Sequence, residues 1–102
     1  MNAYTKNTII PKIKAYLETQ PIVRAWLFGS YSRGEETENS DIDILVDFEK
    51  DSHVGLFKYA GIYADLKDLL GKEVDLVKNG TLKSFAVESA NHDKILIYER
   101  NQ

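Results

Sequence analysis

The stretch that decides the fold is residues 22–48, which read IVRAWLFGSYSRGEETENSDIDILVDF. Both of its ends, 22–28 and 41–48, are rich in the β-branched and aromatic residues that favour strands. The residues between them, 29–39, mix Gly, Ser, Glu and Asn. This composition predicts a turn with at most a short helix after Ser30. Two strands joined by a short link are therefore expected at the centre of the fold.

The chain before this stretch predicts an amphipathic helix over residues 8–18. Its apolar residues recur at helical spacing, at Ile9, Ile10, Ile13 and Leu17. Thr8 is the expected N-cap of this helix. Pro11 would then lie in the first turn, where its missing N–H costs little.

The chain after this stretch predicts two more helices and two more strands. Residues 54–70 form the longer expected helix, and Gly71 stands where a C-cap glycine is common. Its expected apolar stripe is Leu56, Tyr59/Ala60, Tyr63 and Leu66/Leu70. The other expected elements are a strand at 73–77, a helix at 82–90 and a last strand at 94–98.

This order of elements predicts an α+β fold, in which helices back one face of a small mixed β-sheet. The opposite face would be open, and Asp41, Asp43 and Asp75 would project from it. A chain of 102 residues with 43% hydrophobic residues fits one core. We therefore expect a single domain over residues 1–102.

Charge and composition exclude several classes of function. The net charge is −3 and the pI is about 5.3, which argues against strong binding to tRNA or long DNA. The absence of cysteine excludes disulfides and thiolate metal sites. No apolar run approaches the length of a signal peptide or a membrane span, so a cytoplasmic protein is expected.

Three aspartates are the candidate metal ligands and catalytic groups. Asp41 and Asp43 are two residues apart on one expected strand, so their carboxylates would share a face. Like charges so close favour a cation between them, and hard ions such as Mg²⁺ prefer carboxylate oxygens. Asp75 lies on the polar face of residues 73–77 and would join them if that strand pairs beside 41–48. Such a cluster could hold two metal ions.

Gly29 and Ser30 are the candidate phosphate-binding residues. A glycine lets the backbone approach a ligand closely, and the N–H groups that follow it can bind phosphate. The Ser30 hydroxyl can add a donor, and Arg33 can supply positive charge to a triphosphate. Ten residues separate Ser30 from Asp41, so both groups flank the same link between strands.

Other polar and aromatic residues receive a structural interpretation. His53 and His92 lie in polar connections and are expected to be solvated rather than to bind a ligand. The acidic run of Glu35, Glu36 and Glu38 is expected to be a solvated loop, placed where it could gate nucleotide entry. Packing is the expected role of Trp26 and Phe28.

The three motifs together resemble those of the DNA polymerase β-like nucleotidyltransferase superfamily. The matching segments are LFGSYSRG at 27–34, SDIDILV at 40–46 and LGKEVDLV at 70–77. More narrowly, the whole chain is similar to the minimal nucleotidyltransferases, the MNT proteins. The resemblance implies the polymerase β-like fold and transfer of AMP from ATP to a hydroxyl group.

The resemblance also implies the role of each site residue. Asp41, Asp43 and Asp75 would hold Mg²⁺, two ions in all, and Asp75 could help to deprotonate the attacking hydroxyl. Gly29 and Ser30 would bind the β- and γ-phosphates of ATP. Arg33 would assist them.

The family further implies a partner, because MNT proteins are commonly paired as antitoxins with helical HEPN toxins. The arginine-then-histidine signature of HEPN proteins does not precede His53 or His92, so that partner would be another protein. Two alternatives stay open. The chain could mask its partner without chemistry, through exposed aromatics such as Tyr4 or Tyr31, or it could modify a small molecule. A homodimer is also possible, since it would help so small a domain to cover apolar surface.

Overall fold

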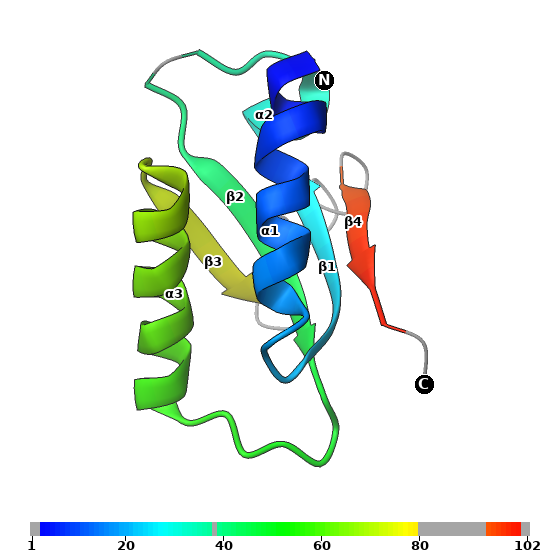
Figure 1. Cartoon of the computed structure of the whole chain (residues 1–102), viewed down its shortest axis with the longest axis vertical. Helices are drawn as coiled ribbons and strands as arrows, with labels where there is room; N and C mark the ends of the chain where they lie inside the picture. The colour runs from blue at the N-terminus through cyan, green and yellow to red at the C-terminus, as the bar shows by residue number, and fades with distance from the viewer. Residues whose placement is uncertain (1–2, 38, 80–93, 101–102) are drawn as a thin grey trace.

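The computed structural model describes residues 3–37, 39–79 and 94–100. Its helices are η1 (Thr5–Ile9), α1 (Ile10–Leu17), α2 (Ser30–Arg33) and α3 (Leu56–Leu70). Its strands are β1 (Ile22–Phe28), β2 (Ile42–Phe48), β3 (Val74–Lys78) and β4 (Ile95–Glu99). The four strands form one mixed sheet, and α1 and α3 lie together on one face of it (Figure 1). The α+β fold expected from the sequence is confirmed.

The strand order is β3-β2-β1-β4, with the two strands of residues 22–48 at the centre. β1 pairs with β2 and with β4 in antiparallel fashion. β2 pairs with β3 in parallel, because α3 returns the chain to the end at which β2 began. The amino ends of β2 and β3 therefore lie at the same end of the sheet as the carboxyl end of β1.

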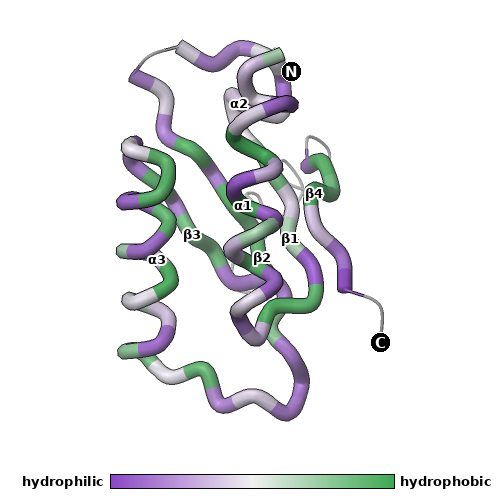
Figure 2. The backbone as a smooth tube through the Cα atoms, in the orientation of Figure 1, coloured by the Kyte–Doolittle hydropathy of each residue, from purple (hydrophilic) through white to green (hydrophobic). Residues whose placement is uncertain are grey.

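The hydrophobic core lies between the sheet and its helices. Ile13 and Leu17 from α1 and Ile62 and Leu66 from α3 are almost fully buried. They pack against the alternating apolar residues of the central strands, and Figure 2 shows hydrophobic and hydrophilic positions in turn along these strands behind the helices. The strand residues in this core are Ile22, Ala25, Leu27, Ile42, Ile44, Val46, Val74, Leu76 and Ile97.

The opposite face of the sheet is less open than expected. Leu45 lies on it and is 1% exposed, with Trp26 and Val77 as its cross-strand neighbours. Trp26 and Phe28 are half-buried and stand outside the main core. The expectation that these two aromatics serve in packing is therefore only partly met.

The first helix begins earlier than the sequence predicts. Thr8 is not its N-cap, because η1 already begins at Thr5 and Tyr4 is its N-cap. Thr5 is fully buried, and its hydroxyl donates a hydrogen bond to Glu36 at 3.3 Å. A tertiary contact therefore extends the helix backwards. The helix is wound as a π-helix ahead of Pro11, which cannot donate to the turn before it.

The buried stripe of α3 also differs from the expected one. Leu56 is 80% exposed and Ala60 is exposed, whereas Ile62 is buried. The packed face consists of Tyr59, Ile62, Tyr63, Leu66 and Leu70. The first turn of α3 extends past the sheet, so the prediction for Leu56 was wrong. Gly71 ends the helix in the left-handed conformation, as expected (φ 63°).

The helix predicted at 54–70 begins two residues later, at Leu56, while the predicted strands agree within a residue. β1 has the predicted bounds, β2 begins one residue later than predicted, and β3 and β4 are each shifted by one residue. The predicted helix at 82–90 lies outside the described residues. Among the helices of the described residues, none is long and apolar enough to cross a membrane.

Candidate active site

The aspartates of β2 and β3 meet in one row across the sheet. Asp43 is the register partner of Asp75 on β3 and of Phe28 on β1. Residues in register share a face of the sheet, so both carboxylates lie on the face opposite the helices. Asp41 lies just before β2 and is exposed. The structure therefore brings together the carboxylates that the sequence predicted, with two on strands and one at a strand entry.

Gly29 lies against the Asp43 carboxylate, at the end of β1. Its backbone has φ 74° and ψ −150°, which an L-residue with a side chain rarely adopts. A Cβ built at Gly29 would overlap Oδ2 of Asp43 and lie 3.1 Å from its Cγ. A side chain at this position would therefore push the carboxylate away. Both the backbone conformation and the close approach require glycine here.

The surroundings of the Asp43 carboxylate disfavour its ionised form. Burial, followed by the negative charges of Asp75 and Asp41, raises its pKa to about 6, and the positive charge of Arg33 opposes this rise. These interactions place all of these charged groups close to Asp43. A carboxyl group with a pKa near neutrality beside other carboxylates is typical of a functional site.

The donor chemistry of this row fits a hard divalent cation. Carboxylate oxygens are the ligands that Mg²⁺ prefers, and a cation would remove the repulsion that Asp43 experiences. Among the described residues, however, no group of three or more His, Cys, Asp or Glu side chains is already arranged to hold a metal ion. Asp43 and Asp75, with Asp41 at the strand entry, are the residues that could contribute ligands.

The turn after Gly29 is the single-turn helix α2, which Gly34 ends in the left-handed conformation (φ 71°). Arg33 closes this turn by donating its N–H to the Gly29 carbonyl at 3.2 Å, and the Ser32 hydroxyl donates to the same carbonyl at 2.8 Å. Ser30 begins the helix beside Gly29, as expected. The Arg33 guanidinium forms an ion pair with Glu35.

The structure agrees with the sequence analysis for some of the other named residues and differs from it for others. Tyr31, a candidate contact residue for a partner, is 2% exposed and belongs to the core, so that prediction was wrong. Tyr4 is 61% exposed and remains available. His53 and Glu35 are exposed as expected, whereas Glu36 is half-buried against Thr5. His92 and Glu38 lie outside the described residues.

Two residues near this row were given no role from the sequence. Tyr59 on α3 donates its hydroxyl to the Leu76 carbonyl, next to Asp75, and burial followed by the Asp75 charge raises its pKa. Lys94 precedes β4, and its Nζ lies 4.5 Å from the centre of the Trp26 ring. The alternation of residues 94–98 could have placed Lys94 on the polar face, but pairing of β4 with β1 is not readable from the sequence.

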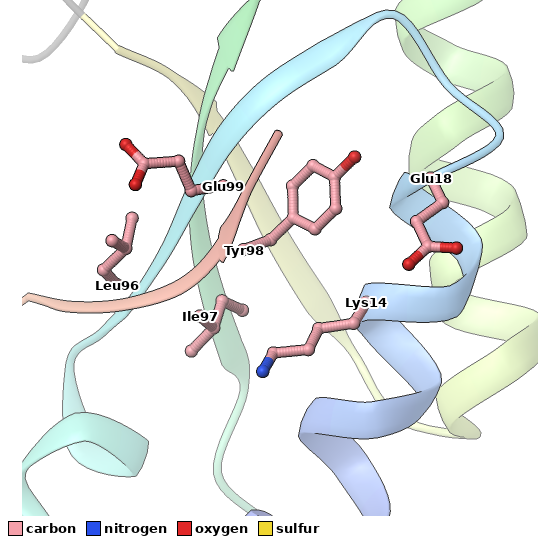
Figure 3. Close-up of a pocket in the computed structure, with 6 residues that line it drawn as sticks. All are labelled: Lys14, Glu18, Leu96, Ile97, Tyr98 and Glu99. Atoms are coloured by element: carbon pink, nitrogen blue, oxygen red, sulfur yellow. The ribbon is translucent and has the colours of Figure 1, made fainter. Parts of the chain in front are cut away.

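A pocket of about 320 Å³ lies elsewhere, between α1 and β4 (Figure 3). Its lining residues are Lys14, Glu18, Leu96, Ile97, Tyr98 and Glu99. None of them belongs to the carboxylate row or to the Gly29 turn. The candidate site therefore lies at the carboxylate row, on the sheet face opposite the helices, rather than in this pocket.

The sequence matches the family model described as "Nucleotidyltransferase domain" over residues 10–98. Among curated proteins, it is similar to a protein adenylyltransferase, MntA, from Thermococcus cleftensis. The two are 52% identical over 58 residues, which cover 57% of each chain.

Solved structures share the fold. One, provisionally described as a minimal nucleotidyltransferase, is 32% identical with a TM-score of 0.75, over 93% of this chain and 95% of that one. A toxin-antitoxin structure with AMP-PNP is 25% identical with a TM-score of 0.76, over 91% of this chain and 75% of that one. A complex of a tri-AMPylated Shewanella oneidensis HEPN toxin with its MNT antitoxin shares the fold at 21% identity, with a TM-score of 0.63 over 98% of this chain and 74% of that one.

Proposed function

Because this chain belongs to the nucleotidyltransferase domain family, as a minimal nucleotidyltransferase, we propose that it transfers AMP from ATP to a hydroxyl group of a partner protein. The partner is a HEPN-type toxin, and the transfer neutralises it. The observation that carries this proposal is the row in which Gly29 touches Asp43 and Asp43 faces Asp75. In this row, the turn that we propose to bind phosphate lies beside two carboxylates.

The proposed reaction is in-line displacement at the α-phosphorus. The acceptor oxygen forms a bond to that phosphorus, the bond to the bridging oxygen of the β-phosphate breaks, and pyrophosphate leaves. Asp75 is exposed on the edge strand β3, where an incoming hydroxyl can reach it, and its carboxylate accepts the hydroxyl proton. Catalysis of this kind rests on positioning and charge stabilisation.

Gly29 and Ser30 bind the β- and γ-phosphates in this proposal. Gly29 leaves room for the nucleotide, and Arg33 exchanges its contact with Glu35 for a phosphate oxygen. Asp41, Asp43 and Asp75 would hold Mg²⁺, two ions in all, and these ions would supply positive charge against the phosphates.

The protein partner is supported by the described fold and by the relatives. The described residues form one sheet with its helices, and they contain no second domain that could hold a small acceptor. A folded protein that docks at the row would supply its own hydroxyl. The related structures that contain a toxin bound to its antitoxin favour the same arrangement.

The proposal is tested by transfer of label from α-labelled ATP to a co-purified partner protein in the presence of Mg²⁺. We expect label on the partner with the wild-type chain and none with the Asp41→Ala/Asp43→Ala double variant. Chelation of the metal ion should have the same effect as the double variant.

A glycine pair provides a sharper control. Gly29→Ala should reduce transfer by at least about 100-fold, because a displaced catalytic group costs that much and the new Cβ overlaps Asp43. Gly61→Ala in α3 places its Cβ where nothing lies within 4 Å, and should leave transfer unchanged.

The Asp41→Ala/Asp43→Ala double variant also separates transfer from masking. If the double variant binds the partner and still protects cells from it, masking is sufficient and the proposed chemistry is not the mode of neutralisation. If label moves only to small hydroxyl compounds and never to the partner, the protein acceptor is wrong.

A further inference from the structure

Lys94 extends the carboxylate row on the side away from Asp75. On β4, Ile95 is the register partner of Leu27 on β1. Continuing this antiparallel register by one residue places Lys94 beside Phe28, and Phe28 is itself the register partner of Asp43. The row therefore runs Asp75, Asp43, Phe28, Lys94 across the sheet, from two anionic residues to a cationic one.

The Lys94 side chain lies on the face of the sheet opposite the helices, which also carries Asp43. Its Nζ stands 4.5 Å from the centre of the Trp26 ring, and Trp26 is the register partner of Leu45 on the face that carries Asp43. Lys94 is half-buried. It makes no ion pair with any residue in the part of the chain that the structure describes. Its charge is held against an aromatic ring, which leaves it able to accept an anion.

We propose that Lys94 binds the terminal phosphates of the nucleoside triphosphate. This inference rests on the proposed function, since it assumes that the α-phosphate lies at Asp43 and the β- and γ-phosphates at Gly29. The polyphosphate then runs from β2 across the end of β1, and its free end points toward β4. Among the residues that the structure describes, Lys94 is a cationic residue at that end of the row.

Distance and charge both support this assignment. Neighbouring strands are about 4.8 Å apart, so the backbones of Asp43 and Lys94 are separated by about 10 Å. A polyphosphate that begins over β2 and a lysine side chain that reaches inward from β4 together span that gap. A triphosphate beside Asp41, Asp43 and Asp75 also needs positive charge at its far end, because Arg33, which would leave Glu35 to bind one phosphate oxygen, is a single positive charge beside three carboxylates.

Trp26 gives this site its own optical signal. It is the single tryptophan of the chain, and the Lys94 ammonium lies over its ring. Movement of Lys94 onto a phosphate changes the environment of that ring. Titration with ATP or inorganic triphosphate should therefore shift the Trp26 emission of the wild-type chain, whereas AMP, which lacks terminal phosphates, should not.

The quantitative test is calorimetric binding of ATP and of AMP, with Mg²⁺, to the wild-type chain, Lys94→Gln, Lys94→Arg and the control Lys12→Gln. Lys12 is exposed on α1, on the helical side of the sheet. Lys94→Gln should weaken ATP binding on the order of 10-fold, the value of one hydrogen bond to a charged group. AMP binding should not change. Lys94→Arg should retain most of the ATP affinity, and Lys12→Gln all of it.

The inference is overturned if Lys94→Gln binds ATP as tightly as the wild-type chain does, or if it loses ATP and AMP affinity equally. These outcomes leave the proposed function intact when the wild-type chain still transfers label. Conversely, Lys94→Gln could bind ATP more weakly than the wild-type chain while the wild-type chain itself transfers no label. That result would support the role of Lys94 in phosphate binding and refute the proposed transfer. Failure of the wild-type chain to bind ATP would refute both.

Discussion

At the scale of single residues, the ionised Asp43 of the candidate site lowers the free energy of unfolding. Asp43 is half-buried, faces Asp75 and touches Gly29, so its ionised form is disfavoured and its pKa rises to about 6. A carboxylate in the unfolded chain has none of these neighbours and loses its proton at its ordinary pKa of 3.8. The folded protein therefore holds this proton more tightly than the unfolded chain does.

The sign of the resulting pH dependence follows from this difference. Between about pH 4 and pH 6, Asp43 contributes a decrease in unfolding free energy as the pH rises, because the folded state binds more protons. Above pH 6 the full penalty is present. A shift of this size corresponds to at most about 3 kcal/mol, and solvent screening around a half-buried side chain reduces it to about 1 kcal/mol.

Asp43→Asn should accordingly raise the unfolding free energy at pH 7 by about 1 kcal/mol when no divalent ion is present, and it should abolish transfer. Denaturation in a chelating buffer at pH 4 and pH 7 measures this, with the gain expected at pH 7 only. The exposed Asp51→Asn serves as the control and should change nothing. An Asp43→Asn protein that is less stable than the wild type at pH 7 would show that the carboxylate stabilises the fold.

At the scale of elements, β3 must hold Asp75 although it is a short edge strand. The carbonyl of Glu73, just before β3, accepts a hydrogen bond from the Ile42 N–H, on the β2 side. Successive carbonyls of a strand point to opposite edges, so the Leu76 carbonyl, three residues later, faces away from β2. The Tyr59 hydroxyl donates to that carbonyl and ties α3 to the free edge beside Asp75.

Tyr59→Phe should therefore loosen β3 and lower the unfolding free energy by about 1 kcal/mol, the net value of one hydrogen bond. Faster hydrogen exchange of the β3 amides and a lower midpoint of thermal unfolding would report it. Tyr4→Phe is the matched control, because Tyr4 is 61% exposed and lies outside the core. Unchanged β3 exchange in Tyr59→Phe would mean that pairing with β2 alone holds the strand.

At the scale of the whole molecule, Arg100 joins segments that are distant in the sequence. Its guanidinium donates to the carbonyls of Leu17, Glu18 and Gln20 at 3.3, 3.2 and 2.8 Å. It also forms an ion pair with Glu49, at the end of β2. One side chain thus adds hydrogen bonds to three carbonyls at the end of α1, two of which, those of Leu17 and Gln20, also accept backbone N–H groups. It fixes the end of β4 against them.

Arg100→Lys should lower the unfolding free energy by about 1 to 2 kcal/mol, because an ammonium cannot reproduce the planar set of donors that these carbonyls share. Arg24→Lys is the control. Arg24 forms ion pairs with Asp47 and Glu99 but its side chain is 48% exposed, so its replacement should cost less than about 0.5 kcal/mol. Equal costs for the two variants in chemical denaturation would contradict the role given to Arg100.

The sequence by itself determined the elements whose patterns are local. The alternation in residues 41–48 and the apolar spacing in residues 8–18 depend only on which faces the chain itself presents. Gly29-Ser30, Asp41, Asp43 and Asp75 could be singled out as candidates for the same reason, since each stands at a strand end or on the polar face of a strand. The order of the elements then predicted a mixed sheet with helices on one face.

The tertiary structure decided what depends on the neighbours of each element. Tyr31 is buried and Leu56 is exposed because α2 folds onto the core and the first turn of α3 extends past it, which no periodicity reveals. Helix η1 begins early because Thr5 contacts Glu36, 31 residues away. The alignment of Asp75, Asp43 and Lys94 is likewise a matter of strand register. Register arises from pairing between strands, and a single sequence does not state which strands pair.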